Sequence, residues 1–169
     1  MGIPRFSNQS SNKKKGYTLI EILVSLTIIG AIFGFGYASF RDFSRRQAVA
    51  DAAKLIQGDL RFAQENAMAG QKPAGCNTTL DSYSFNRLSS TRYTIDANCG
   101  AATVTVKDVN VSFGITLSTP SPNPIKFNVL GRGTNVDGSG GSENWELILT
   151  QEVTTNSVTV IVTPGGEIK

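Results

Sequence analysis

Residues 13–30 read KKKGYTLIEILVSLTIIG, and this stretch decides how the rest of the chain is organised. Three lysines and a glycine precede an apolar run that continues to Phe40 and contains one charged residue, Glu21. A helix over residues 17–40 is long enough to span a bilayer, which takes about 20 apolar residues. Lysines ahead of the span predict a cytoplasmic N-terminus. Because a carboxylate in such a segment is costly, some other group is expected to compensate it.

Residues 1–16 form a polar, basic leader without apolar periodicity. An ordinary secretory signal has a short apolar core followed by a small-residue cleavage site, whereas here the polar break comes before the core. The leader carries four of the 16 basic residues and no acid, so the rest of the chain has 12 basic against 13 acidic residues. The net charge of +3 and the pI near 9.0 therefore do not indicate a nucleic-acid partner.

Residues 41–70 continue the same helix in amphipathic form. Apolar side chains recur at steps of three, four and seven, and Gly70 and Pro73 are stop signals, so one helix is predicted over residues 17–69. Most charged residues, Asp59 among them, are expected on the opposite face. A plain juxtamembrane stalk is the alternative, but the stripe of mostly small residues favours packing against a sheet. The stripe consists of Val49, Ala52, Ala53, Ile56, Leu60, Ala63 and Ala67.

The region 71–169 is predicted to be an extracytoplasmic, β-rich globular domain, because period-two patterns replace the helical one. Seven short runs without intervening helices indicate antiparallel sheets, giving an α+β fold in which a long helix packs on a β-sandwich. The expected strands are 82–85, 92–95, 102–106, 109–115, 125–131, 144–150 and 157–163. The turns expected between them are 86–91, 96–100, 118–124 and 131–144.

Candidate metal, cofactor and covalent sites are few. The chain has no histidine, which excludes a histidine-based metal site or triad. The glycine-rich stretch 137–142 lacks the strand, helix and Lys-Ser/Thr pair of a phosphate loop, and Asp137 with Glu143 supplies too few oxygens for calcium, so a hairpin tip is expected. Cys76 and Cys99 are predicted to form a disulfide if the domain lies outside the cytoplasm; otherwise they are two small buried residues. No cofactor is expected.

The N-terminal segment resembles the class III signal of type IV pilins and type II secretion pseudopilins. Its features come in the same order: lysines, Gly16, the aromatic Tyr17, Glu21 and an apolar helix. The resemblance implies that a prepilin peptidase cuts between Gly16 and Tyr17 and N-methylates Tyr17. Most family members have phenylalanine at this place, and tyrosine keeps the aromatic bulk. The resemblance also implies that Glu21 pairs with the N-terminal ammonium of a neighbouring subunit, an intramolecular pair being the alternative.

Residues 59–73, DLRFAQENAMAGQKP, lead into the β-rich region and resemble the GspH/FimT-type branch of minor pilins and pseudopilins. Some members of that branch bind DNA through a basic tail, but here the tail is Gly166-Glu167-Ile168-Lys169, so DNA binding is not expected. Many pilins have a proline in the apolar helix. This chain has none between residues 17 and 69, and Gly34 and Gly36 are the weak points that remain.

The sequence therefore predicts a non-enzymatic filament subunit, a minor pilin or pseudopilin of an initiation or tip complex. Its expected partners are other pilin subunits, the prepilin peptidase, the inner-membrane assembly platform, and membrane lipid before assembly. It is expected to cross the cytoplasmic membrane once, with the domain in the periplasm or at the cell surface. The alternatives are a binding module on an uncleaved anchor and a minor pilin of a DNA-uptake pilus; an enzyme has least support. Only the filament hypothesis requires cleavage at Gly16.

Overall fold

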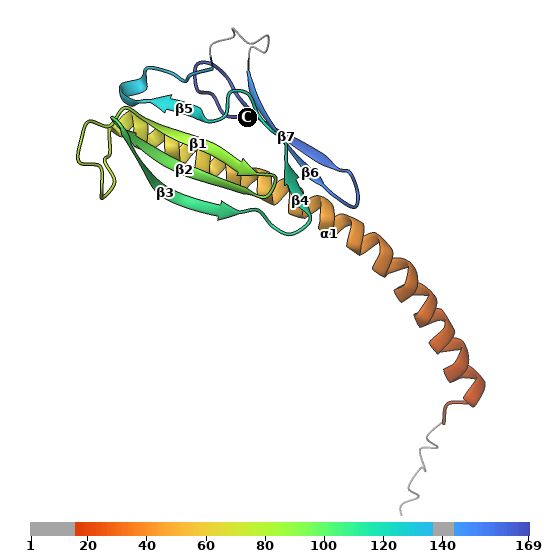
Figure 1. Cartoon of the computed structure of the whole chain (residues 1–169). Helices are drawn as coiled ribbons and strands as arrows, with labels where there is room; N and C mark the ends of the chain where they lie inside the picture. The colour runs from red at the N-terminus through yellow and green to blue at the C-terminus, as the bar shows by residue number, and fades with distance from the viewer. Residues whose placement is uncertain (1–15, 137–143) are drawn as a thin grey trace, which may run out of the picture. The chain divides into compact units, whose positions relative to one another are not determined.

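The computed structural model describes residues 16–136 and 144–169 (Figure 1). The expectations for the leader and for residues 137–142 therefore lie outside the described residues, apart from Gly16. Helix α1 runs from Leu19 to Ala69, and the chain divides into two compact units, Met1–Phe40 and Arg41–Lys169. The strands of the second unit are β1 Ser82–Ser89, β2 Arg92–Cys99, β3 Ala102–Asn110, β4 Ile115–Leu117, β5 Ile125–Asn128, β6 Trp145–Gln151 and β7 Ser157–Val162.

These strands form two antiparallel sheets. The larger sheet has the order β3-β2-β1-β5 and the smaller one the order β4-β6-β7. Hairpins join β1 to β2, β2 to β3 and β6 to β7, while β5 reaches the far edge of β1 after a longer excursion. The predicted α+β class, with one long N-terminal helix and antiparallel sheets, is confirmed.

The core of the second unit lies between the helix and the two sheets. All seven members of the predicted stripe on α1, from Val49 to Ala67, are buried. Four of them are alanines, whose small side chains let the helix backbone approach the sheet closely. Phe85 stacks on Tyr93 with ring centroids 4.7 Å apart and meets Trp145 edge-on at 5.7 Å. The stripe therefore packs against a sheet and is not a stalk surface.

Several strand boundaries differ from the sequence prediction. The expected turns 86–91 and 96–100 lie largely within β1 and β2, which extend to Ser89 and Cys99. The expected strand 109–115 is the end of β3, a loop, and the start of β4. Polar side chains of these strands bond to one another: Asn98 donates to Ser82 and Ser84 on β1, Thr105 on β3 donates to Asp96, and Thr94 donates to Asp96 within β2. Asn, Asp, Ser and Thr usually favour turns. Here these bonds keep such residues in an extended conformation.

The predicted strand 125–131 is also shorter in the structure. Strand β5 ends at Asn128, and the 3-10 turn η1 covers Val129–Gly131. Leu130 has a φ of 58°, in the left-handed region, and Gly131 follows with a φ of 69°. Two successive residues with positive φ end the extended conformation, which is why the apolar run does not continue as a strand.

Candidate functional site

The residues singled out in the sequence lie at the start of α1. Gly16 and Tyr17 precede the helix, and both are exposed. Thr18 caps it, because its Oγ1 accepts a hydrogen bond from the Glu21 N–H at 3.3 Å. One turn later, the Ser25 hydroxyl donates to the Glu21 carbonyl at 2.7 Å. The spacing Thr-x-x-Glu is that of a capping box, so the helix has a defined first turn directly after the predicted cleavage point.

Glu21 stands in this first turn, where the unpaired N–H groups of the helix favour a negative charge. Within residues 16–136 and 144–169, no lysine or arginine forms an ion pair with its carboxylate. The partial charge of a helix terminus acts only over the first turn and is worth about 0.3–1 kcal/mol at an exposed site. The ion pairs of the described residues therefore do not compensate this carboxylate in an apolar environment.

The helix around Glu21 presents apolar side chains in all directions. Leu19 is 81% exposed, Ile20 70% and Phe33 74%. Among the described residues, α1 is the helix that is long and apolar enough to cross a membrane. Such a surface is stable when lipid tails or other apolar helices cover it, because exposed apolar area costs about 25 cal/mol per Å² in water.

A second polar cluster fixes the distal half of α1 to the larger sheet. The buried carboxylate of Asp59 accepts hydrogen bonds from the Tyr93 hydroxyl, at 2.7 Å, and from the Lys107 ammonium. Burial raises the pKa of Tyr93, and the hydrogen bond to Asp59 raises it further, so the phenol stays protonated as a donor. The expectation that Asp59 faces solvent with the other charged residues is wrong. Its place three residues after Ile56 and one before Leu60 was the available signal for the core side of the helix.

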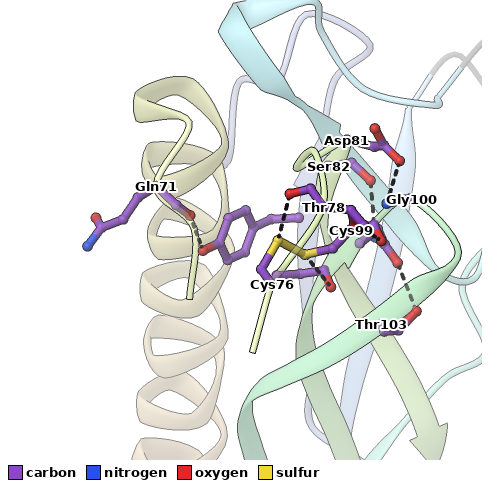
Figure 2. The surroundings of a disulfide bond; sticks show 11 residues. Gln71, Cys76, Thr78, Asp81, Ser82, Cys99, Gly100 and Thr103 are labelled. Atoms are coloured by element: carbon purple, nitrogen blue, oxygen red, sulfur yellow. Dashed lines mark hydrogen bonds between the residues drawn. A yellow bond between two sulfur atoms is a disulfide. The ribbon is translucent and has the colours of Figure 1, made fainter. Parts of the chain in front are cut away.

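The disulfide predicted between Cys76 and Cys99 is present in the structure, with Cα atoms 5.7 Å apart. Figure 2 shows that it ties the segment after α1 to the end of β2. Hydrogen bonds flank it: Thr78 Oγ1 donates to the Cys99 carbonyl at 2.7 Å, and the Gly100 N–H donates to Asp81 Oδ2 at 2.9 Å. The bond therefore closes the loop by which the chain passes from the helix into the sheet.

Possible metal sites and cavities are the remaining features to consider among the described residues of the second unit. In the described part of the chain, no three His, Cys, Asp or Glu side chains come together as possible metal ligands. A cavity of about 290 Å³ lies beside the C-terminal end of α1, between Gln64, Phe127, Gly133 and Gly166. Among the described residues, its lining contains no Asp, Glu, Lys, Arg, Tyr or Cys side chain.

Comparison with known proteins agrees with the geometry of the N-terminal segment. Residues 11–37 match a family described as the prokaryotic N-terminal methylation motif. No curated protein and no solved structure matches the chain. The matched segment contains Gly16, Tyr17 and Glu21 and most of the apolar half of α1. The chain thus carries a type IV pilin-like prepilin signal on a helix suited to anchor it in a membrane, and the match supports a pilin or pseudopilin that is processed by prepilin peptidase and assembles with other pilin subunits.

Proposed function

We propose that this protein is a minor pilin or pseudopilin of the GspH/FimT type, a structural subunit of a type IV pilus or a type II secretion pseudopilus. The observation that carries the proposal is the methylation-motif match over residues 11–37, in register with a capped helix start at Thr18 and Glu21. Prepilin peptidase removes residues 1–16 and methylates the new N-terminus at Tyr17. Residues 17–40 then serve first as the membrane anchor and later as the filament core.

The chemistry of assembly in this proposal is charge pairing at Glu21. Cleavage creates an ammonium at Tyr17, and methylation keeps it basic. In a filament, the apolar half-helices pack together, and a lone carboxylate there costs several kcal/mol. The N-terminal ammonium of a neighbouring subunit compensates this cost and fixes the axial register between the two helices. The carboxylate is exposed and without an ion pair in the described chain, so it is available for such a partner.

The domain organisation follows from the same proposal. Residues 41–70 form the amphipathic half of the helix, and residues 71–169 form the domain that the anchor displays outside the cytoplasm. The disulfide between Cys76 and Cys99 supports this placement, because disulfides persist in oxidising compartments. Before assembly the subunit resides in the cytoplasmic membrane with its N-terminus inside, where the assembly platform receives it.

The first experiment is the intact mass and the N-terminal peptide of the protein, from membranes with and without active prepilin peptidase. Loss of residues 1–16 and gain of one methyl group on Tyr17, both dependent on the peptidase, are the expected results. A full-length, unmethylated chain in cells with a working peptidase would refute the filament proposal. The domain would then be a binding module on a permanent anchor.

The second experiment separates processing from assembly. Glu21→Ala is expected to leave cleavage intact and to reduce incorporation into filaments by about tenfold or more, because its partner ammonium is left unpaired in the apolar core. Ser25→Ala is the matched control, one turn along the same exposed helix. Glu21→Gln keeps the shape and removes the charge. Normal incorporation of both Glu21 variants, measured by immunoblotting of sheared filaments, would exclude charge pairing as the assembly determinant.

A further inference from the structure

The cavity of about 290 Å³ lies at one end of the second unit, beside the last turns of α1. Met68 and Phe127 contribute apolar side chains to its lining, and Met68 is 55% exposed. Part of the wall is peptide backbone without side chains, at Gly131, Gly133, Gly165 and Gly166. An aromatic ring fits such a space, because a protein cavity of about 150 Å³ already holds benzene.

Hydrogen bonds hold the walls of this cavity in place. The Gln64 side-chain amide donates to the Gly166 carbonyl at 2.8 Å, which ties the helix to the segment after β7. The Asn128 N–H donates to the Gly133 carbonyl at 3.0 Å, which ties the end of β5 to the segment that follows η1. The cavity is therefore formed before any ligand arrives.

A large apolar ring stands unused elsewhere on the same unit. Phe113, in the loop between β3 and β4, is completely exposed, at 104%, and makes no packing contact in its own domain. Val153 in the turn between β6 and β7 is 64% exposed. The two segments are joined, because the Glu152 N–H donates to the Gly114 carbonyl at 2.9 Å. An exposed ring of this kind is favourable when a partner covers it.

The ring and the cavity lie at opposite ends of the second unit. Phe127, in the cavity wall, pairs with Tyr83 near the start of β1. The loop that carries Phe113 lies beyond the end of β1, because the Val111 N–H donates to the Thr91 carbonyl at 2.9 Å. In Figure 1 the arrowheads of β1 and β3 both point toward β4. The separation is roughly 20 Å, so the ring does not reach the cavity of its own chain.

The two ends also carry opposite charges. Glu152 adjoins the loop of Phe113, and Arg132 stands between Gly131 and Gly133 of the cavity wall. Both side chains are exposed, and neither takes part in the ion pairs of the described residues. Complementary charges at the edge of a contact orient two surfaces toward one another.

We infer that Phe113 of one copy of this chain inserts into the cavity of a second copy, with Glu152 of the first facing Arg132 of the second. The inference rests on the assembly of subunits in the proposed function and names a contact between their globular domains. In the cavity, the ring meets the Met68 thioether, a favourable partner for an aromatic edge. Because ring and cavity lie at opposite ends, each copy binds one neighbour by its ring and another by its cavity. Such head-to-tail contacts repeat along a row of copies, as a filament requires.

The test is cross-linking of full-length chains in their own membranes with a short bismaleimide, which reacts with free thiols. Both native cysteines form the disulfide, so the introduced thiols are the reactive ones. Val153→Cys/Leu130→Cys places one thiol beside the ring and one beside Gly131 of the cavity, at positions that are 64% and 73% exposed. Val153→Cys/Leu55→Cys is the matched control, because Leu55 is 67% exposed on α1 but does not line the cavity.

The first pair is expected to give a ladder of dimers, trimers and longer products, and the control pair few products. Adding Phe113→Ser to the first pair should reduce the ladder about tenfold, because the buried ring is lost, and should leave the Tm of the domain unchanged. An unchanged ladder in the Phe113→Ser variant, or equal yields from the control pair, would overturn the contact. Dimers from Val153→Cys alone at the same yield would overturn it too, since they would indicate a symmetric contact.

A charge exchange tests the orientation. Glu152→Lys should reduce the ladder several-fold, and Glu152→Lys/Arg132→Glu should restore it. Loss without restoration would overturn the assigned pairing. The mass of the chain in the same membranes separates this inference from the proposed function. A processed, methylated chain without a ladder would overturn the contact alone, whereas a ladder from a full-length, unmethylated chain would support the contact and refute the filament proposal.

Discussion

Removal of one hydroxyl group, in Tyr93→Phe, tests how the helix is held to the sheet. Tyr93 is 1% exposed, and its hydroxyl donates to the Asp59 carboxylate at 2.7 Å. A hydrogen bond to a charged group contributes about 1.5–3 kcal/mol to stability. The Lys107 side chain is about half exposed, so it keeps part of its hydration and only partly replaces the lost donor. We therefore expect Tyr93→Phe to cost about 2 kcal/mol of the free energy of unfolding.

Tyr83→Phe is the matched control within the same chain. Tyr83 is buried to the same degree, but its hydroxyl donates to the neutral carbonyl of Gln71, at 2.6 Å. A neutral hydrogen bond contributes about 0.5–1.5 kcal/mol. The two variants remove the same atom from comparable surroundings and differ in the charge of the acceptor. Tyr93→Phe should therefore destabilise the domain more than Tyr83→Phe.

The assay is thermal unfolding of the full chain in detergent, followed by the near-ultraviolet circular dichroism of buried Trp145. A cost of about 2 kcal/mol corresponds to a fall in Tm of roughly 8 °C for a domain of this size. In an Asp59→Asn background, which makes the acceptor neutral, the cost of Tyr93→Phe should fall to about 1 kcal/mol. Equal costs for Tyr93→Phe and Tyr83→Phe, or no dependence on Asp59, would show that the carboxylate is not what strengthens this contact.

Two further predictions concern the disulfide and an exposed ion pair. The double variant Cys76→Ala/Cys99→Ala should lose about 3 kcal/mol of unfolding free energy in the same assay, because the disulfide closes a loop with a sequence separation of 23 residues; an unchanged Tm would contradict this. The hydrogen bond from Arg92 lowers the pKa of Asp108 in the folded state. The contribution of this ion pair to the free energy of unfolding is therefore fully present above the pKa of Asp108 in the unfolded chain, about 3.9. It is lost as the pH falls through the lower pKa of Asp108 in the folded state. The Tm difference between the wild type and Asp108→Asn should shrink on acidification from about pH 5 to pH 2, and a difference that grew would mean that the shift has the opposite sign.

The sequence predicted well the elements in which buried apolar residues recur at regular intervals along the chain. The stripe from Val49 to Ala67 specifies both the helix and the face that packs on the sheet, because a single side of a helix can meet a flat surface. The signal at Gly16, Tyr17 and Glu21 was also readable, because it depends on order along the chain and not on folding. Both inferences use information that is local in sequence.

The errors arose where distant residues decide the conformation. Asp96 and Asn98 favour turns when considered alone, yet they lie in β2 because Thr105 and Ser84 on the neighbouring strands bond to them. Asp59 is buried because Tyr93 and Lys107 reach it from the sheet, and these residues are 34 and 48 positions away in the chain. The place of Asp59 beside Ile56 and Leu60 indicates the core side of the helix, but local patterns do not reveal its distant partners.

The two halves of α1 differ in what covers them, and this difference supports the assembly proposal. The distal half has its apolar stripe covered by the domain, whereas Leu19, Ile20 and Phe33 in the first half remain mostly exposed in the chain itself. Lipid and a bundle of similar helices satisfy an all-apolar surface equally well, so apolar packing alone gives no reason to prefer one state or one register. A carboxylate close to the N-terminus behaves differently. In the proposed function it lies near the head groups while the chain is in the bilayer, where water and cations reach it, but in a filament core it requires a cation at a fixed position. Under the assembly proposal, Glu21 therefore makes transfer into the filament depend on a correctly placed ammonium, which an apolar residue at this position would not do.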